Sequence, residues 1–121
     1  MRILALETSC DETAVAVIED GTKVLCNVIA STQLLFEHAG GVIPEQAARR
    51  QVEYIVPVIE EALNGTGMTP ETLDAIAVTK GPGLMGSLLV GTSTARVLAS
   101  LWMLPLIGVH HTLGHLTSPW L

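Results

Sequence analysis

Short apolar and β-branched stretches, separated by turn residues, occupy the start of the chain and predict strands. Residues 3–6 form an apolar run of the kind that fills a central strand. Residues 13–18 and 23–31 are rich in β-branched side chains, and Asp20-Gly21 between them is typical of a hairpin turn. Three strands joined by tight turns predict an antiparallel meander.

The pattern becomes helical after a loop-like segment at 32–43. Between residues 45 and 63, apolar side chains recur every three or four positions, and Pro44 stands where a first helical turn tolerates proline. We expect Pro57 to bend this helix and Asn64-Gly65 to end it.

The second half of the chain alternates between strand and helix patterns. Residues 74–79 predict a fourth strand, 86–101 a buried helix, and 106–109 a fifth strand. The order is therefore βββαβαβ. Helices that cross between the later strands imply a mixed α/β sheet, and the length of 121 residues suits a single domain.

Composition adds two constraints to this picture. The chain is 49% hydrophobic but only 3% aromatic, so its core must be aliphatic. All 12 carboxylates lie between Glu7 and Asp74, whereas residues 81–121 carry one charged side chain, Arg96. A back half this apolar is expected to pack against another surface. The net charge of −6 argues against this chain gripping nucleic acid by itself.

A transmembrane segment at 84–107 is the competing interpretation of the apolar back half. Its length suffices, but Arg96 near its middle and several Ser, Thr and Gly residues disfavour a span. The N-terminus lacks the apolar run of a secretory signal. Cys10 and Cys26 lie in apolar or strand-like surroundings, which favours reduced thiols and a cytoplasmic protein.

A polar run separates the first two predicted strands and reads Glu7-Thr8-Ser9-Cys10-Asp11-Glu12-Thr13. Its backbone N–H groups, with Ser9 and Cys10, are candidates for holding phosphate oxygens. Asp11 and Glu12 are candidates for placing Mg²⁺ or a proton. The alternative is an ordinary hairpin turn whose Asp and Ser side chains make only local hydrogen bonds.

The turn Gly81-Pro82-Gly83 leads from a predicted strand into a predicted helix. Glycines let the backbone approach a ligand and a helix N-terminus favours an anion, so Gly81 and Gly83 are candidate phosphate-binding residues. The turn lacks the Gly-Lys-Ser/Thr ending of a P-loop and the spacing of a dinucleotide fingerprint. In the alternative interpretation, Gly86 and Gly91 only let the helix lie close to the sheet.

His111 and His115 form the most informative pattern of the chain. In a helix that begins near His111, both imidazoles project from one face and can share a metal ion. A catalytic zinc or iron usually takes three protein ligands, so we expect a further ligand from outside this chain. A His-Glu-x-x-His protease is disfavoured, because Thr112 follows the first histidine and no Asp or Glu follows Asp74.

Together these motifs closely resemble one family, the tRNA adenosine threonylcarbamoyltransferases, formerly called O-sialoglycoprotein endopeptidases or glycoproteases. The matching stretches occur in family order over residues 4–119. Besides the run at 7–13, they are Gly40-Gly41-Val42-Ile43-Pro44-Glu45, Gly81-Pro82-Gly83-Leu84, Gly86-Ser87-Leu88-Leu89-Val90-Gly91, Gly108-Val109-His110-His111 and Gly114-His115.

The resemblance implies an RNase H-like, actin-like ATPase fold, shared with sugar kinases and heat-shock proteins, of which residues 1–121 are the N-terminal lobe. It implies transfer of a threonylcarbamoyl group from threonylcarbamoyl-AMP to N6 of adenosine 37 in tRNA. His111 and His115 match ligands of one Fe²⁺ or Zn²⁺ ion, and Asp11 and Glu12 match acidic positions facing the cleft. Mg²⁺ with a nucleotide, an actin-fold partner subunit and an ATPase subunit are also implied.

Three positions depart from the family pattern. Leu113 replaces a Glu between the metal histidines and so removes a candidate acid behind the ligands. Gln51 replaces a histidine, and Ala39 an aromatic residue. Because the remaining metal ligand belongs to a second lobe in this family, we expect weak metal binding and no turnover by the chain alone. The alternatives are a non-catalytic actin-fold scaffold subunit, whose members generally lack the histidine pair, and a degraded fragment without function.

Overall fold

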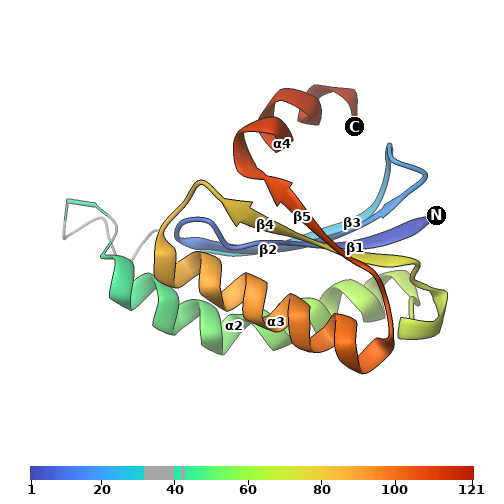
Figure 1. The fold of residues 1–121 in the computed structure, drawn as a ribbon, viewed down its shortest axis with the longest axis horizontal. Helices are drawn as coiled ribbons and strands as arrows, with labels where there is room; N and C mark the ends of the chain where they lie inside the picture. The colour runs from blue at the N-terminus through green and yellow to red at the C-terminus, as the bar shows by residue number, and fades with distance from the viewer. Residues whose placement is uncertain (32–39, 42) are drawn as a thin grey trace.

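A computed structural model describes residues 1–31, 40–41 and 43–121 of the chain (Figure 1). Most of the loop expected at 32–43, including Ala39, lies outside the described residues. Five strands form one mixed sheet in the order β3-β2-β1-β4-β5. The expected α/β class is therefore confirmed.

The first three strands form the predicted meander. β1 (Arg2–Glu7), β2 (Glu12–Glu19) and β3 (Lys23–Ser31) pair antiparallel in chain order. The turn between β2 and β3 has φ of 53° at Asp20 and 80° at Gly21. They are the two central residues of a turn that the Thr22 N–H closes on the Glu19 carbonyl at 3.4 Å, and positive φ at both is what a type I′ hairpin turn requires, which explains the Asp-Gly sequence.

Two crossover connections complete the sheet. β4 (Ala75–Gly81) pairs parallel to β1, and β5 (Leu106–His110) pairs parallel to β4. The connecting helices, α2 (Pro44–Thr66) and α3 (Met85–Trp102), cover the same face of the sheet, whereas α4 (His111–Thr117) lies on the other side (Figure 1). The sequence order βββαβαβ is confirmed. The short 3-10 helices η1 (Pro70–Thr72) and η2 (Ser118–Trp120) complete the regular structure.

The expected end of α2 at Asn64-Gly65 is wrong. The helix continues to Thr66 and ends at Gly67, which has φ of 67° and donates its N–H to the carbonyls of Asn64 and Leu63. A glycine in this left-handed conformation satisfies the last carbonyls, so Gly67 is the stop signal. Pro57 lies inside the helix without ending it.

An aliphatic core lies between the sheet and the two covering helices. Alternate residues of β1 and β2, such as Leu4 and Val15, are fully buried against α2 side chains that include Ile55 and Ile59. Each such side chain contributes about 1.5–3 kcal/mol of burial free energy, which an aliphatic composition supplies without aromatic residues. Among the described residues, no helix combines the length and hydropathy that a bilayer span needs.

Helix α3 lies close to the sheet at Gly91. A Cβ atom built there would be 2.4 Å from Thr8 Oγ1. The Thr8 hydroxyl donates to the Ser87 carbonyl at 2.7 Å and accepts the Gly91 N–H at 3.1 Å. The absence of a side chain at Gly91 therefore lets α3 pack closely on Thr8 at the end of β1, in agreement with the interpretation that this glycine lets the helix lie close to the sheet.

Candidate metal site

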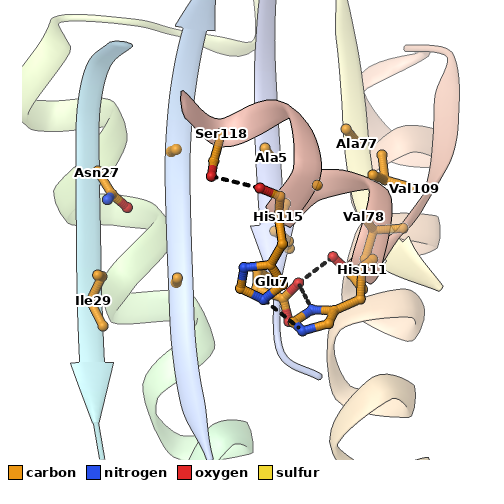
Figure 2. A pocket seen from close by; sticks show the side chains of 15 residues that line it. Ala5, Glu7, Asn27, Ile29, Ala77, Val78, Val109, His111, His115 and Ser118 are labelled. Atoms are coloured by element: carbon orange, nitrogen blue, oxygen red, sulfur yellow. Dashed lines mark hydrogen bonds and ion pairs between the residues drawn. The ribbon is translucent and has the colours of Figure 1, made fainter. Parts of the chain in front are cut away.

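The histidine pair lies where β5 ends and α4 begins. His111 is the first residue of α4, and His115 follows one turn later on the same face. The two Nε2 atoms are 2.9 Å apart, and the rings meet edge to face with centroids 4.5 Å apart and an interplanar angle of 83° (Figure 2). Both rings thus direct the same nitrogen toward one point.

This spacing suits a shared metal ion. Two imidazole nitrogens that bind one ion at about 2.0–2.1 Å are about 3.3 Å apart in the tetrahedral geometry of zinc, so the rings need to separate by only about 0.4 Å to take an ion between them. Neutral imidazole is a good ligand for both Fe²⁺ and Zn²⁺. Within the described part of the chain, no third His, Cys, Asp or Glu joins the pair to make a three-residue cluster. The donor set that this chain shows is therefore two imidazoles, one short of the three protein ligands usual at a catalytic site.

Glu7, the last residue of β1, contacts His111 at Nδ1, on the side of the ring opposite the nitrogen that faces His115. Its Oε2 lies 3.2 Å from His111 Nδ1 and accepts a 2.5 Å hydrogen bond from the Thr79 hydroxyl (Figure 2). Its Oε1 accepts the Ser9 N–H at 2.6 Å, and Ser9 Oγ lies 3.1 Å from His111 Nδ1. Glu7 and Ser9 therefore both contact the ring nitrogen of His111 that faces away from His115, and Thr79 holds the Glu7 carboxylate.

Opposing effects set the pKa of the Glu7 carboxyl group. Burial raises this pKa, but hydrogen bonds from Ser9, Thr79 and His111 to the carboxylate outweigh that effect and hold it below the usual value. Glu7 is therefore an anion at neutral pH, next to the imidazole of His111.

A cavity of about 420 Å³ lies beside the pair, on the sheet face that α2 and α3 do not cover. Small side chains such as Ala5, Ala16 and Ala77 line it. Asn27 on β3 lies farther from the histidines (Figure 2). Glu7, His111 and His115 also line it. A small polar ligand in this cavity would therefore lie next to the imidazoles.

The predicted acidic pair lies apart from this cavity. Glu12 begins β2 and is exposed, and Asp11 precedes it in a half-buried turn position. As far as the described residues go, neither side chain lines the cavity beside the histidines. The backbone carbonyl of Glu12 instead accepts a 2.9 Å hydrogen bond from Gln51 of α2, so the turn is tied to the covering helix.

The candidate phosphate-binding residues are divided between the two turns. Ser9 is buried, and its carbonyl accepts the Leu84 N–H at 2.7 Å. A Cβ atom on Gly83 would be 2.5 Å from that same carbonyl oxygen, so the glycine turn packs directly on the β1–β2 turn. Gly81 has φ of 149° and pairs with His110 of β5.

Cys10, the remaining candidate, is exposed. Desolvation and the Asp11 carboxylate raise the pKa of its thiol, so the thiol is protonated at neutral pH.

Sequence reasoning missed Glu7 and Thr79. It sought an acid behind the ligands only next to them in sequence, at Leu113, whereas the structure provides Glu7 from 104 residues earlier. The signal was in the topology: β1, β4 and β5 run parallel as neighbours, so Glu7, Thr79 and His111 at their carboxyl ends share one edge of the sheet. Ligand sites of α/β sheets lie at this edge.

The mixed sheet in the order β3-β2-β1-β4-β5, with both crossover helices on one face, is an α/β fold of the RNase H-like, actin-like type (Figure 1). The solved structure of YeaZ from Pseudomonas aeruginosa superposes with a TM-score of 0.67 at 23% identity over 91% of this chain and 45% of that chain. A second structure, of an uncharacterized Pseudomonas aeruginosa protein similar to the peptidase YeaZ, gives 0.69 at 24% identity over 90% of this chain and 43% of that one. At these identities the likeness shows the fold.

The model of the tRNA N6-adenosine threonylcarbamoyltransferase family, TsaD, matches residues 23–121, and the chain belongs to this family. Similar proteins with that description include one from Thermomicrobium roseum, 55% identical over 100% of this chain and 33% of its own length. The protein from Bacillus subtilis is 50% identical over 96% of this chain and 34% of its own length. The chain thus spans about a third of the length of these relatives.

Proposed function

We propose that this chain is the N-terminal lobe of a cytoplasmic enzyme that transfers a threonylcarbamoyl group from threonylcarbamoyl-AMP to N6 of an adenosine in tRNA. Family membership supports a transferase that modifies tRNA. The observation that carries the proposal is the pair of Nε2 atoms 2.9 Å apart at the carboxyl edge of the sheet, inside the matched segment.

His111 and His115 hold the proposed Fe²⁺ or Zn²⁺ ion through Nε2. When bound, the ion supplies Lewis-acid affinity for phosphate or carbamoyl oxygens and orients the acyl donor. The cavity beside the pair offers the donor a place at the same edge of the sheet.

Asp11 and Glu12 are the proposed acidic groups, which take the proton that the N6 amine loses on acylation or place Mg²⁺ with a nucleotide. Gly81 and Gly83, with Ser9 and Cys10, are the proposed contacts to phosphate. The Ser9 N–H already donates to Glu7 and Ser9 Oγ lies 3.1 Å from His111 Nδ1, so a phosphate contact would share this hydroxyl group with the histidine.

Turnover requires more than this chain. The described part of the chain provides two imidazole ligands, and the net charge of −6 disfavours the binding of tRNA phosphates by this chain alone. We therefore expect the third ligand and the tRNA contacts from a second lobe or from partner proteins.

The covering helices carry an exposed apolar surface, which we call the α2–α3 face. This surface supports the proposal that an actin-fold partner subunit binds the chain. Its large members are Val52, Val56, Leu89, Val97 and Leu101, each more than half exposed. An apolar surface on adjacent helices is typical of a protein–protein interface. We propose that the partner subunit docks there and that an ATPase subunit completes the complex.

A chimera tests the proposed activity. Residues 1–121 replace the corresponding segment of the Bacillus subtilis relative, which is 50% identical over 116 residues. We expect the purified chimera to form threonylcarbamoyladenosine in tRNA, and the same chimera with His111→Ala and His115→Ala to fall to background. Full activity without both imidazoles, or a folded but inactive chimera with them, contradicts the proposal.

The isolated chain separates the enzyme from the alternatives. With threonylcarbamoyl-AMP and tRNA, it is expected to form no product, and measurable product contradicts the requirement for further elements. A scaffold or a degraded fragment predicts that the intact chimera is inactive as well.

A further inference from the structure

We infer that Glu7 is a positioning residue for the metal pair: held by Thr79 and Ser9, its carboxylate keeps the proton of His111 on Nδ1 and so leaves Nε2 free to bind the ion. This inference rests on the proposed metal-binding function of the two histidines and adds the group that prepares one of them.

The tautomer follows from the contacts at Nδ1. Glu7 Oε2 is 3.2 Å from this nitrogen, and a carboxylate oxygen can only accept a hydrogen bond. An unprotonated Nδ1 would turn its lone pair toward that anion, which is unfavourable. The neutral imidazole of His111 therefore carries its proton on Nδ1, and Ser9 Oγ at 3.1 Å lies beside the same proton.

The arrangement has a consequence on the other side of the ring. With the proton on Nδ1, His111 Nε2 presents a lone pair to His115 Nε2 at 2.9 Å. Two lone pairs do not tolerate this distance, so either a proton on His115 Nε2 or a shared cation must lie between them. For a metal ion to bind both Nε2 atoms, the proton of neutral His115 must move from Nε2 to Nδ1, whereas His111 already presents its Nε2 lone pair.

Glu7 is itself well fixed. The Thr79 hydroxyl donates to Oε2 at 2.5 Å and the Ser9 N–H to Oε1 at 2.6 Å, so both carboxylate oxygens are held. Thr79 is 6% exposed and lies on the interior strand β4, next to a register shift between Thr79 and Gly81. Carboxylates that accept the second ring proton of a ligating histidine orient the ring and raise its basicity.

The test uses two isosteric substitutions in the metal-free chain. Glu7→Gln introduces an amide that can donate to Nδ1, and Thr79→Val removes the hydroxyl group that holds the carboxylate without touching His111. Long-range ¹H–¹⁵N spectra report the tautomer of His111. We expect the Nδ1–H form in the unaltered chain, a shift toward the Nε2–H form in Glu7→Gln, and a smaller shift in Thr79→Val.

The second readout is zinc affinity, measured by calorimetry with Zn²⁺ alone. Loss of such a carboxylate typically weakens metal binding by about 10–100-fold, which is the range expected for Glu7→Gln. Glu60→Gln, the same chemical change at an exposed position of α2, is the matched control and is expected to leave tautomer and affinity unchanged. Thr79→Val keeps the test valid if Glu7→Gln fails to fold.

The outcomes separate this inference from the proposed function. If the unaltered chain binds zinc and Glu7→Gln binds it equally well with the same tautomer, Glu7 has no positioning role. If the unaltered chain binds no zinc, the metal-binding function on which the inference rests is contradicted.

Discussion

At the residue scale, Gln51 shows how a single side chain shapes the candidate site. It is fully buried in α2, and its Nε2 lies 3.4, 3.0 and 2.9 Å from the carbonyl oxygens of Thr8, Cys10 and Glu12. One amide therefore serves three carbonyls of the β1–β2 turn, which carries most of the candidate polar residues. The family resemblance leads us to expect a histidine here, and the amide of Gln51 provides N–H donors at the same position.

Replacing Gln51 by leucine should destabilise the fold. Gln51→Leu keeps the volume of the side chain but leaves buried carbonyls without their donor, at a cost of about 1–3 kcal/mol. Urea unfolding followed by circular dichroism measures the change in the free energy of unfolding. Gln46→Leu, at an exposed position of the same helix, is the control and should cost far less. Equal effects of the two substitutions would show that the Gln51 hydrogen bonds add nothing.

At the scale of elements, the hydrophobic pattern predicted nearly all the strands and helices. β2 and α2 repeat against one buried face, whereas β4 is a continuous buried run. The expected ends were less accurate: α2 runs past Asn64-Gly65 because the left-handed conformation, and with it the cap, falls on Gly67. The meeting of Glu7, Thr79 and His111 was not predicted, since it depends on which strands are neighbours in space.

The packing of α3 on β1 makes a prediction about Gly91. Gly91→Ala places a methyl group 2.4 Å from Thr8 Oγ1 and should break the Gly91–Thr8 hydrogen bond as the helix moves away. Overpacking of this kind costs about 1–3 kcal/mol, measured as a lower free energy of unfolding.

Gly65→Ala is the matched control. Gly65 is exposed within α2, with open space around its Cβ position, so an alanine should stabilise the helix by about 0.5–1 kcal/mol. A Gly91→Ala protein as stable as the unaltered chain would refute the close approach of α3 to the sheet.

For the molecule as a whole, the sequence indicated an apolar back half that packs against another surface. The structure places part of it, Leu89, Val97 and Leu101, on the α2–α3 face. In the absence of a partner, such a face promotes association between copies. Sedimentation velocity of the purified chain should therefore show concentration-dependent association, which Val97→Glu together with Leu101→Glu reduces. Val97 and Leu101 are 64% and 71% exposed, so these substitutions leave the core intact. A chain that stays monomeric at all concentrations would argue against this face as an interface.

The sequence also indicated that the two histidines share a face, and the resemblance gave them a metal. The sequence could not predict which elements surround the two histidines, because β1, β4 and β5 come from distant parts of the chain and become neighbours only in the folded sheet. The proposed activity depends on whether these two imidazoles bind the same metal ion.

Calorimetric titration of the purified chain with Zn²⁺ measures this most directly, beside the variants His111→Ala and His115→Ala. His110→Ala, the exposed neighbour at the end of β5, is the matched control. We predict that the unaltered chain and His110→Ala bind a single ion weakly. Both His111→Ala and His115→Ala should lose this binding. Zinc binding that survives His115→Ala unchanged, or a chain that binds no zinc at all, would contradict the shared site.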